Sequence, residues 1–339
     1  MKFSSERIDM SHGAGGKATA RLIEGMILPA LANPALAELT DAATIACGDA
    51  RLAFTTDAFV VKPLVFPGGS IGELAVNGTV NDLAVSGATP LALSSALIVE
   101  EGLEASALRH EVEAMAAAAR RAGVSIVTGD TKVVERGKAD GLYIVTTGLG
   151  LVDPGFDLSS KRVRPGDRIL CSGTIGDHGI AIMIARGNLE LEAEAVSDTR
   201  PLTPLVAALS RAAGPDVKFM RDPTRGGVAT VLNELARDSG LGVVIDERRL
   251  PVREVVLGAC EILGLDPLTV ANEGKLLAVV APESAERALE ALRNTPGGED
   301  AAIIGEIRPE PARMVLMLTE FGGTRMVDML IGDPLPRIC

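Results

Sequence analysis

A segment without any periodic pattern divides the chain into two halves. Residues 153–167, with the sequence DPGFDLSSKRVRPGD, bring Pro, Gly and Ser between two stretches that alternate strand-like and helix-like patterns. Such alternation is typical of α/β domains. The chain has 339 residues, enough for about two domains of roughly 150 residues each. We therefore predict an α/β (α+β) fold with domains at 1–155 and 156–328, followed by a flexible tail at 329–339.

The first half combines one clear helix pattern with several strand patterns. The helix is predicted over 104–122, where four apolar residues follow at steps of four, three and four: Leu108, Val112, Met115 and Ala119. Gly123 directly after it is a stop signal. Three short apolar runs predict strands: 52–56, 124–127 and 142–147. We expect the apolar helix face to lie on the sheet that these strands form.

The second half repeats the alternation. Strands are predicted at 168–171, 276–280 and 301–304. One helix is predicted from an apolar stripe that ends at Gly240 and is formed by Val228, Val231, Leu232 and Leu235. A further helix is expected after Pro282. The last eight residues contain Pro334 and Pro336, so they cannot continue a helix or a central strand. We expect an extended, mobile tail.

Charge and composition exclude several classes of function. The formal net charge is -12 and the aromatic content is 2%, so the chain offers neither an attractive field for nucleic acid nor stacking platforms for bases. No segment approaches the roughly 18 apolar residues that would span a bilayer, and the N-terminus is polar. We expect a cytoplasmic protein that binds neither nucleic acid nor membrane.

The four cysteines do not have the spacing of a zinc site or a disulfide framework. Cys47, Cys171 and Cys260 stand in apolar surroundings, which predicts core positions. Cys339 is the last residue of the chain, on the Pro-rich tail. A thiol there is expected to be exposed and mobile, which on a surface is ordinarily a liability and therefore suggests a function, although a chance position is the alternative.

A glycine-rich loop near the N-terminus is the first candidate binding element. Its sequence from Ser11 to Lys17 is SHGAGGK, and Gly13, Gly15 and Gly16 permit a close backbone approach. Backbone N–H groups together with Lys17 could surround a polyphosphate. Alternatively, the glycines form an ordinary turn before a helix over 19–26.

Acidic residues next to predicted strands form a second candidate element. Four acids follow this pattern: Asp49, Asp57, Asp82 and Asp222. Because Mg²⁺ prefers oxygen ligands and nucleotide sites hold it through a few carboxylates, acids that converge from several strand ends fit a Mg²⁺-ATP site. Taken singly, each of them also fits a turn or an N-cap.

Two further polar segments complete the candidates. Residues 128–132 (TGDTK) follow a predicted strand, where Lys132 could neutralise phosphate charge and Asp130 could orient it or bind metal. Residues 272–275 (NEGK) precede a buried strand, and Glu273 could act as a general base if desolvated. An ordinary solvated loop is the alternative for the first segment.

Taken together, these motifs resemble the HypE family of hydrogenase maturation factors, essentially from end to end. The matching stretches are HGAGGK at 12–17, PGG at 67–69, NDLAVSGA at 81–88, TGDTK at 128–132, SGTIGDHG at 172–179, DPTRGG at 222–227 and PRIC at 336–339. The resemblance places the chain in the superfamily of aminoimidazole ribonucleotide synthetase and selenophosphate synthetase, whose members bind ATP. It implies a two-domain fold in which the N-terminal sheets of two copies form a barrel across a homodimer.

The resemblance also implies roles for individual residues. Metal ligands would be Asp49, Asp57, Asp82 and Asp222. Nucleotide contacts would come from Gly13, Gly15, Gly16, Lys17, Asn81, Gly129, Asp130 and Thr131. Catalytic residues would be Cys339, Glu273 and Lys132, with Glu273 as the base.

The implied activity is an ATP-dependent dehydration. A HypF-type carbamoyltransferase would place a carbamoyl group on Cys339, and phosphorylation of the amide oxygen followed by loss of the N–H proton would leave a thiocyanate. The product would supply cyanide for the iron of [NiFe]-hydrogenase through a HypC–HypD-type scaffold. Two rivals are a selenophosphate synthetase, whose glycine-rich loop usually carries a reactive Cys or selenocysteine that is lacking here, and a non-catalytic nucleotide-binding carrier of a modified thiol.

Overall fold

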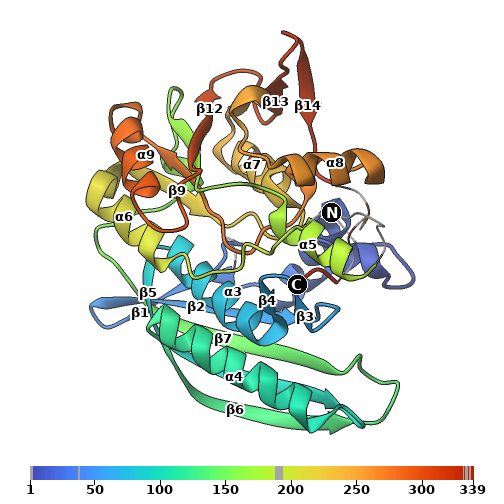
Figure 1. Cartoon of the computed structure of the whole chain (residues 1–339). Coiled ribbons are helices and arrows are strands. Elements are labelled where there is room, and N and C mark those ends of the chain that lie inside the picture. The colour runs from blue at the N-terminus through green and yellow to red at the C-terminus, as the bar shows by residue number, and fades with distance from the viewer. Residues whose placement is uncertain (1–2, 37–38, 188–193, 331, 333–334, 336) are drawn as a thin grey trace.

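Two large β-sheets form the framework, and each half of the chain supplies one of them (Figure 1). The computed structural model describes residues 3–36, 39–187, 194–330, 332, 335 and 337–339. The predicted mixed α/β fold is confirmed by this arrangement. Within the described residues, no helix combines the length and the apolar character that crossing a membrane requires.

The first sheet has five strands in the order β1-β2-β7-β5-β6. Its strands are β1 (Ala43–Cys47), β2 (Ala50–Phe59), β5 (Ala88–Glu100), β6 (Ser125–Val134) and β7 (Leu142–Val152). Only β5 and β6 run parallel, and a parallel pair needs a crossover connection. The helix predicted over 104–122 supplies it as α4 (Ala105–Ala122), which ends at Gly123 with φ 70°.

Helix α3 (Ile71–Val85) lies between the two halves of the molecule (Figure 1). It follows a short hairpin of β3 (Val65–Phe66) and β4 (Gly69–Ser70). Nearly all of its residues are buried, because the first sheet covers one side and the second half of the chain covers the other. Its sequence is accordingly apolar around most of its circumference. Helix α3 therefore carries its last turn, with Asp82, to the boundary between the halves.

The second sheet has seven strands in the order β14-β13-β10-β12-β8-β11-β9. Its strands are β8 (Arg168–Cys171), β9 (Val217–Arg221), β10 (Gly242–Asp246), β11 (Leu277–Val280), β12 (Ala302–Arg308), β13 (Val315–Leu318) and β14 (Thr324–Val327). Ile169 and Cys171 pack on the side of α7 (Gly227–Ser239), whereas Leu170 packs with α6 (Thr203–Ala213) and α9 (Ala285–Arg293). Helices α5 (Asp177–Ala185) and α8 (Glu254–Leu263) complete this half. The alternation along β8 places helices on both sheet faces.

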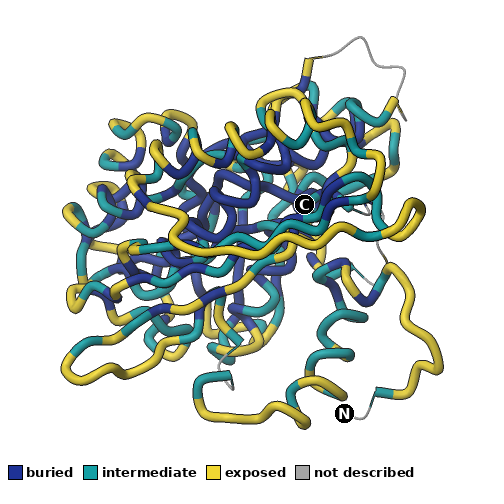
Figure 2. The backbone as a smooth tube through the Cα atoms, turned by 90° about the horizontal axis from the view of Figure 1, so that it is seen from below, coloured by how far each residue is buried: buried dark blue, intermediate teal, exposed yellow. Residues whose placement is uncertain are grey.

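An N-terminal arm precedes the first sheet. A 3₁₀ turn (Met10–Gly13) leads into α1 (Lys17–Leu22), a π turn (Ile23–Ile27) and α2 (Leu28–Leu31), so the helix predicted over 19–26 is present with a wider turn in its second half. Figure 2 shows that the arm extends from the body of the molecule and is largely exposed.

The end of the chain is docked in this structure, and the mobility predicted for the tail stays a prediction. Leu335 and Ile338 are buried in the core that joins the halves, and Cys339 is half-buried. The backbone N–H of Val60 donates to the carbonyl of Cys339 at 3.1 Å. Apolar burial and backbone pairing hold the docked end in place; Pro334 and Pro336 themselves lie outside the described residues.

Residues 128–132 belong to β6, which continues through them as far as Val134, so the alternative of a solvated loop does not apply. The core position predicted for Cys47 is wrong. Cys47 is exposed because it is the last residue of β1, where the strand enters a hairpin turn. Cys171 and Cys260 are buried as predicted.

Candidate active site

Three carboxylates converge at the boundary between the two halves. Their ligand oxygens, one each from Asp41, Asp82 and Asp222, lie within 4.8 Å of one another. Asp41 precedes β1, Asp82 lies in the last turn of α3, and Asp222 directly follows β9. The cluster thus joins the N-terminal sheet, the central helix and the second sheet in one place.

Electrostatic repulsion is concentrated in this cluster. Burial is the main cause that raises the pKa of Asp82 well above its ordinary value, and the charges of Asp57, Asp222 and Asp41 raise it further. The pKa of Asp222 is likewise raised well above its ordinary value by burial and by Asp41 and Asp57. A carboxylate in the last turn of a helix also faces the negative end of the helix dipole. Bringing these acids together is therefore costly for folding, which is typical of functional sites.

Asp57 is the fourth member of the group. It lies on β2 with Thr146 opposite, on the sheet face that packs on α3. A Cβ atom placed on Gly78 of α3 would lie 3.9 Å from its Oδ2. Burial raises the pKa of Asp57, and the charge of Arg225 opposes that shift.

Cationic and hydroxyl groups partly compensate the acids. The guanidinium of Arg221 pairs with Asp41 at 3.0 Å and with Glu234, and Thr55 donates to Asp82 at 2.7 Å. These partners bind two members of the cluster, Asp41 and Asp82. They account for only part of its negative charge.

Glu273 is buried close to the cluster. Its side chain is 4% exposed, and its Oε1 has no hydrogen-bond partner among the described residues. Burial raises its pKa well above the ordinary value, and the charges of Asp222, Asp198 and Asp57 add to the shift. The raised pKa means that the Glu273 carboxyl binds a proton more readily than an ordinary carboxyl does.

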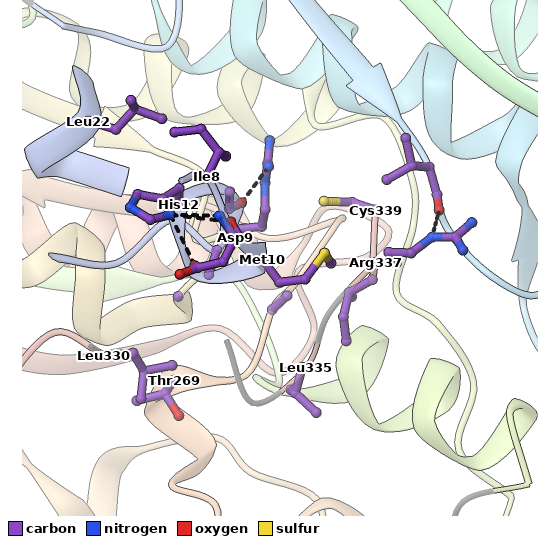
Figure 3. A pocket seen from close by; sticks show the side chains of 17 residues that line it. Ile8, Asp9, Met10, His12, Leu22, Thr269, Leu330, Leu335, Arg337 and Cys339 are labelled. Atoms are coloured by element: carbon purple, nitrogen blue, oxygen red, sulfur yellow. Dashed lines mark hydrogen bonds and ion pairs between the residues drawn. The ribbon is translucent and has the colours of Figure 1, made fainter. Parts of the chain in front are cut away.

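A cavity of about 340 Å³ is lined by the end of the chain and by residues that follow Asp222 and precede Glu273 in sequence. Figure 3 shows the Cys339 side chain pointing into the cavity, which Asp9, Met10 and His12 also line. The wall includes Arg225, three residues after Asp222, and Ala271, two residues before Glu273. The cavity and the acid cluster therefore share the chain segments that build them.

The glycine-rich loop is a second part of the cavity wall. Gly15 has φ 77°, and a Cβ there would lie 2.7 Å from Cβ of Arg225; a Cβ on Gly16 would lie 2.4 Å from the carbonyl oxygen of Leu330. The glycines thus permit close packing on the chain itself. Lys17 forms an ion pair with Asp328 at 2.5 Å. The structure places this loop next to the turn that follows Asp222, as a common site requires.

Two predicted ligands are not available to a ligand at the acid cluster in this structure. Asp49 is exposed in the turn between β1 and β2 and is not part of the cluster. Asp41, eight positions earlier, stands there instead. Asn81 has a buried amide that is engaged within the chain: it donates to the carbonyls of Arg200 and Glu273 and accepts from Leu202. Its amide therefore holds the second half of the chain against α3 rather than facing a ligand.

The segment 128–132 does not reach the acid cluster within one chain. Asp130 pairs with Ala96 on β5, and the same row of paired residues continues across the sheet to Ala58 on β2. Ala58 is the neighbour of Asp57, so its side chain points to the opposite face of the sheet. Asp130 therefore lies on the face opposite that of Asp57. Three strand spacings of about 4.8 Å, or roughly 14 Å, separate β6 from β2. Asp130 and Lys132 are exposed and pair with each other at 2.6 Å.

Comparison with known proteins identifies the family of this chain. The AIR synthase related protein family matches twice, with its N-terminal domain at residues 39–152 and its C-terminal domain at 164–316. Carbamoyl dehydratase HypE of Bradyrhizobium diazoefficiens is 54% identical over 332 residues, which cover 98% of this chain and 96% of the relative. The chain belongs to the HypE family. HypE of Escherichia coli is 47% identical and covers 98% of this chain and 99% of its own.

Solved HypE structures share the fold. A HypE structure in complex with ATP has a TM-score of 0.82 and 47% identity, and covers 97% of this chain and 98% of its own. A HypE–HypF complex has a TM-score of 0.87, also at 47% identity, and covers 91% of this chain and 99% of its own. The family predicted from the motifs is confirmed.

Proposed function

We propose that this protein dehydrates a carbamoyl group on its own Cys339 to a thiocyanate, at the expense of ATP. The observation that carries the proposal is the position of the Cys339 side chain, which points into a cavity bounded by the glycine-rich loop and Arg225. Asp222 of the acid cluster and Glu273 are three and two positions from the wall residues Arg225 and Ala271. A HypE relative solved in complex with ATP supports ATP as the nucleotide.

The acid cluster fits Mg²⁺ bound with ATP. Its carboxylate oxygens are the ligand type that Mg²⁺ prefers, and the mutual repulsion that raises the pKa of Asp82 and Asp222 is the cost that a divalent cation would relieve. Asp41, Asp82 and Asp222 would hold the ion, with Asp57 beside them. The bound ion would neutralise charge on the transferring phosphoryl group.

Glu273 suits removal of a proton from the carbamoyl nitrogen. Its raised pKa favours proton uptake, and its Oε1 is not engaged by another group of the described chain. Over the whole reaction the amide oxygen leaves with the transferred phosphoryl group as phosphate, and the nitrogen loses both protons. Sulfur then carries a nitrile, with no change of oxidation state.

Two partners follow from the same chemistry. The carbamoyl group would come from a HypF-type carbamoyltransferase, and a HypE–HypF complex is known for a relative. The thiocyanate would be consumed by a HypC–HypD-type iron scaffold. Because the end of the tail is docked through backbone hydrogen bonds, both partners would have to meet it in an undocked position.

We further propose a homodimer in which the open face of the first sheet is covered by the partner copy. Helices α3 and α4 cover only one face, and the other exposes Ile45, Phe54 and Leu151. Strand β6 also presents an unpaired edge. A barrel formed with a second sheet would bury both features. The segment 128–132 would then act on the nucleotide of the partner copy.

ATP consumption tests the proposal. The full chain with Cys339 carbamoylated should hydrolyse ATP in a burst of one equivalent per modified thiol, while the unmodified chain should be at least about tenfold slower. Equal rates for both forms would favour the non-catalytic carrier, which binds nucleotide without coupling it to the tail. A Cys339→Ala chain treated in the same way serves as the control.

A further inference from the structure

The segment 197–199 is linked to the docked tail through His178, and it contacts the turn that holds Glu273 directly. It lies in the second half of the chain, shortly before α6, and it is buried throughout. The N–H of Ser197 donates to the carbonyl of Pro67 at 2.8 Å, and Asn77 of α3 donates to Thr199 at 3.2 Å. The segment is therefore fixed to the N-terminal half as well.

His178 connects this segment to the tail. Its ring is fully buried, with Nδ1 at 2.8 Å from the Ser197 hydroxyl and Nε2 at 3.0 Å from the carbonyl oxygen of Ile338. A carbonyl only accepts, so Nε2 carries the proton and donates. Nδ1 of the neutral ring then accepts from the Ser197 hydroxyl, whose oxygen in turn accepts from the N–H of Thr199 at 3.2 Å. The donor and acceptor roles of the His178 nitrogens and of the Ser197 hydroxyl are therefore all compatible.

Asp198 connects the same segment to Glu273. Its carboxylate accepts from the N–H of Glu273 at 3.0 Å and from the N–H of Gly274 at 3.2 Å. Lys275 pairs with it at 3.3 Å, with both side chains buried. The approach is so close that a Cβ on Gly274 would lie 1.9 Å from the backbone oxygen of Asp198. The turn is thus clamped onto the segment.

We propose that His178 and Asp198 are positioning residues, joined through Ser197, that hold the carbamoylated tail and the Glu273 carboxyl in one rigid frame. The proposal rests on the proposed function. Oε1 of Glu273 has no hydrogen-bond partner among the described residues, and Asp198 holds the backbone N–H of the residue that carries it. The tail depends on Ile338, whose carbonyl His178 holds. A misplacement of about 1 Å between reacting groups can cost on the order of 10²-fold in rate.

The first test removes the hold on Glu273. Asp198→Asn keeps the size of the side chain but presents an amide N–H toward one of the two N–H groups, so the turn should shift. At saturating ATP the rate constant of water loss from the carbamoylated chain should fall at least about tenfold. The ATP concentration for half-maximal rate should stay unchanged, and so should the alkylation rate of Cys339. A parent-like rate in a folded Asp198→Asn chain would overturn the proposal.

The second test uses two variants at His178 that separate its two nitrogens. His178→Gln can place an amide N–H near the position of Nε2, while His178→Asn reaches only as far as Nδ1. In a Cys47→Ser background, where Cys339 is the accessible thiol, the Asn variant should be alkylated at Cys339 at least about threefold faster by iodoacetamide. The carbamoylated Asn variant should also lose water more slowly than the parent. In the Gln variant, the alkylation rate and the rate of water loss should each return at least halfway to the parent value.

These experiments separate the inference from the function on which it rests. If the parent chain, carbamoylated with cyanate and supplied with Mg²⁺-ATP, loses no water, the proposed function fails, while the alkylation rates still report on the His178 contact. If the parent loses water but Gln and Asn variants are alkylated and react alike, the positioning role of His178 is wrong. Should Asp198→Asn not fold, the His178 pair still decides the proposal.

Discussion

Two polar regions that the motifs predict as parts of one nucleotide site are held in opposite ways. The acid cluster of Asp41, Asp57, Asp82 and Asp222 is enclosed by both halves of a single chain. The segment 128–132 lies on an exposed edge strand, and its charged side chains point to the uncovered sheet face. One region is completed by folding, whereas the other, on our proposal, is completed by a second copy of the chain.

The two regions differ in the free energy that folding spends on burying their charged groups. Burial raises the pKa of the clustered carboxyls, so folding tolerates a cost there that only a ligand can relieve. At 128–132, Asp130 and Lys132 neutralise each other in solvent, and hydrogen bonds to Lys132 lower the pKa of Asp130. Such an exposed pair contributes little to stability. We therefore expect substitutions in the two regions to affect binding, rate and folding differently.

The largest effect is expected at Glu273. Glu273→Gln keeps the shape of the side chain but removes the proton acceptor, so the rate constant of water loss from the carbamoylated chain should fall by about 10²–10⁴-fold. Binding of Mg²⁺-ATP should change little, because the carboxyl is not in the cluster of ligand oxygens. Single-turnover mass spectrometry measures the first quantity and calorimetry the second. A parent-like rate would exclude Glu273 as the base.

A smaller effect is expected in the acid cluster. Asp82→Asn removes one charge from the group, and the affinity for Mg²⁺-ATP should fall by at least about 10–100-fold, since loss of even an outer partner of a metal ligand costs that much. Asp57→Asn should weaken binding in the same direction. Asp49→Asn is the matched control, because Asp49 is exposed in a hairpin turn and should leave the calorimetric isotherm unchanged. Equal binding by all three variants would contradict the proposed ligands.

A third prediction concerns the segment on β6. Lys132→Met should leave thermal stability unchanged, because the side chain is exposed, and should lower the rate of water loss by about tenfold. Within a mixed dimer, a Lys132→Met chain and an Asp82→Asn chain would together retain one unaltered site. Co-expressed chains with different tags should therefore recover activity that neither variant shows alone. A mixed dimer as slow as its parents would show that the segment does not act across the interface.

The smallest effect is a pH dependence of stability at His178. Burial lowers its pKa below the ordinary value of 6.5, the charge of Arg186 adds to this, and Asp198 together with the Ile338 carbonyl opposes it. The neutral ring therefore contributes stability that is present above about pH 6.5 and is lost as the pH falls through the lowered pKa. Urea unfolding of the parent and His178→Gln chains across pH 5–7 should show the steeper loss in the parent. Parallel curves would refute this linkage.

Much of the fold was predictable because local patterns coincide with tertiary structure. The helix over 104–122 ends at Gly123 with a positive φ, and the strand at 168–171 has the predicted bounds. The continuation of β6 through 128–132 was not predictable, because Gly129 and charged residues are also typical of loops. An exposed edge strand lacks the apolar alternation that identifies a half-buried one.

The site was predictable in part for the same reason. Asp57 follows a predicted strand, Asp82 and Asp222 stand in motifs, and packing brings the three together. Asp41 was missed because its partner Arg221 is 180 positions away, and nothing in the surrounding LTDAAT marks it. The docking of the tail was also hidden: it depends on His178, Val60 and the buried Ile338, which are distant in sequence.

Intact mass of the C-terminal peptide tests the central claim most directly. The full chain is carbamoylated by a HypF-type partner, supplied with Mg²⁺-ATP, and cleaved on the N-terminal side of Asp333. The account predicts that the peptide ending in Cys339 first gains one carbamoyl group and then, only with ATP, loses the mass of one water, while Cys339→Ala gains and loses nothing. Retention of the carbamoyl mass in the presence of ATP, or the same two changes on another residue of the Ala variant, would contradict it.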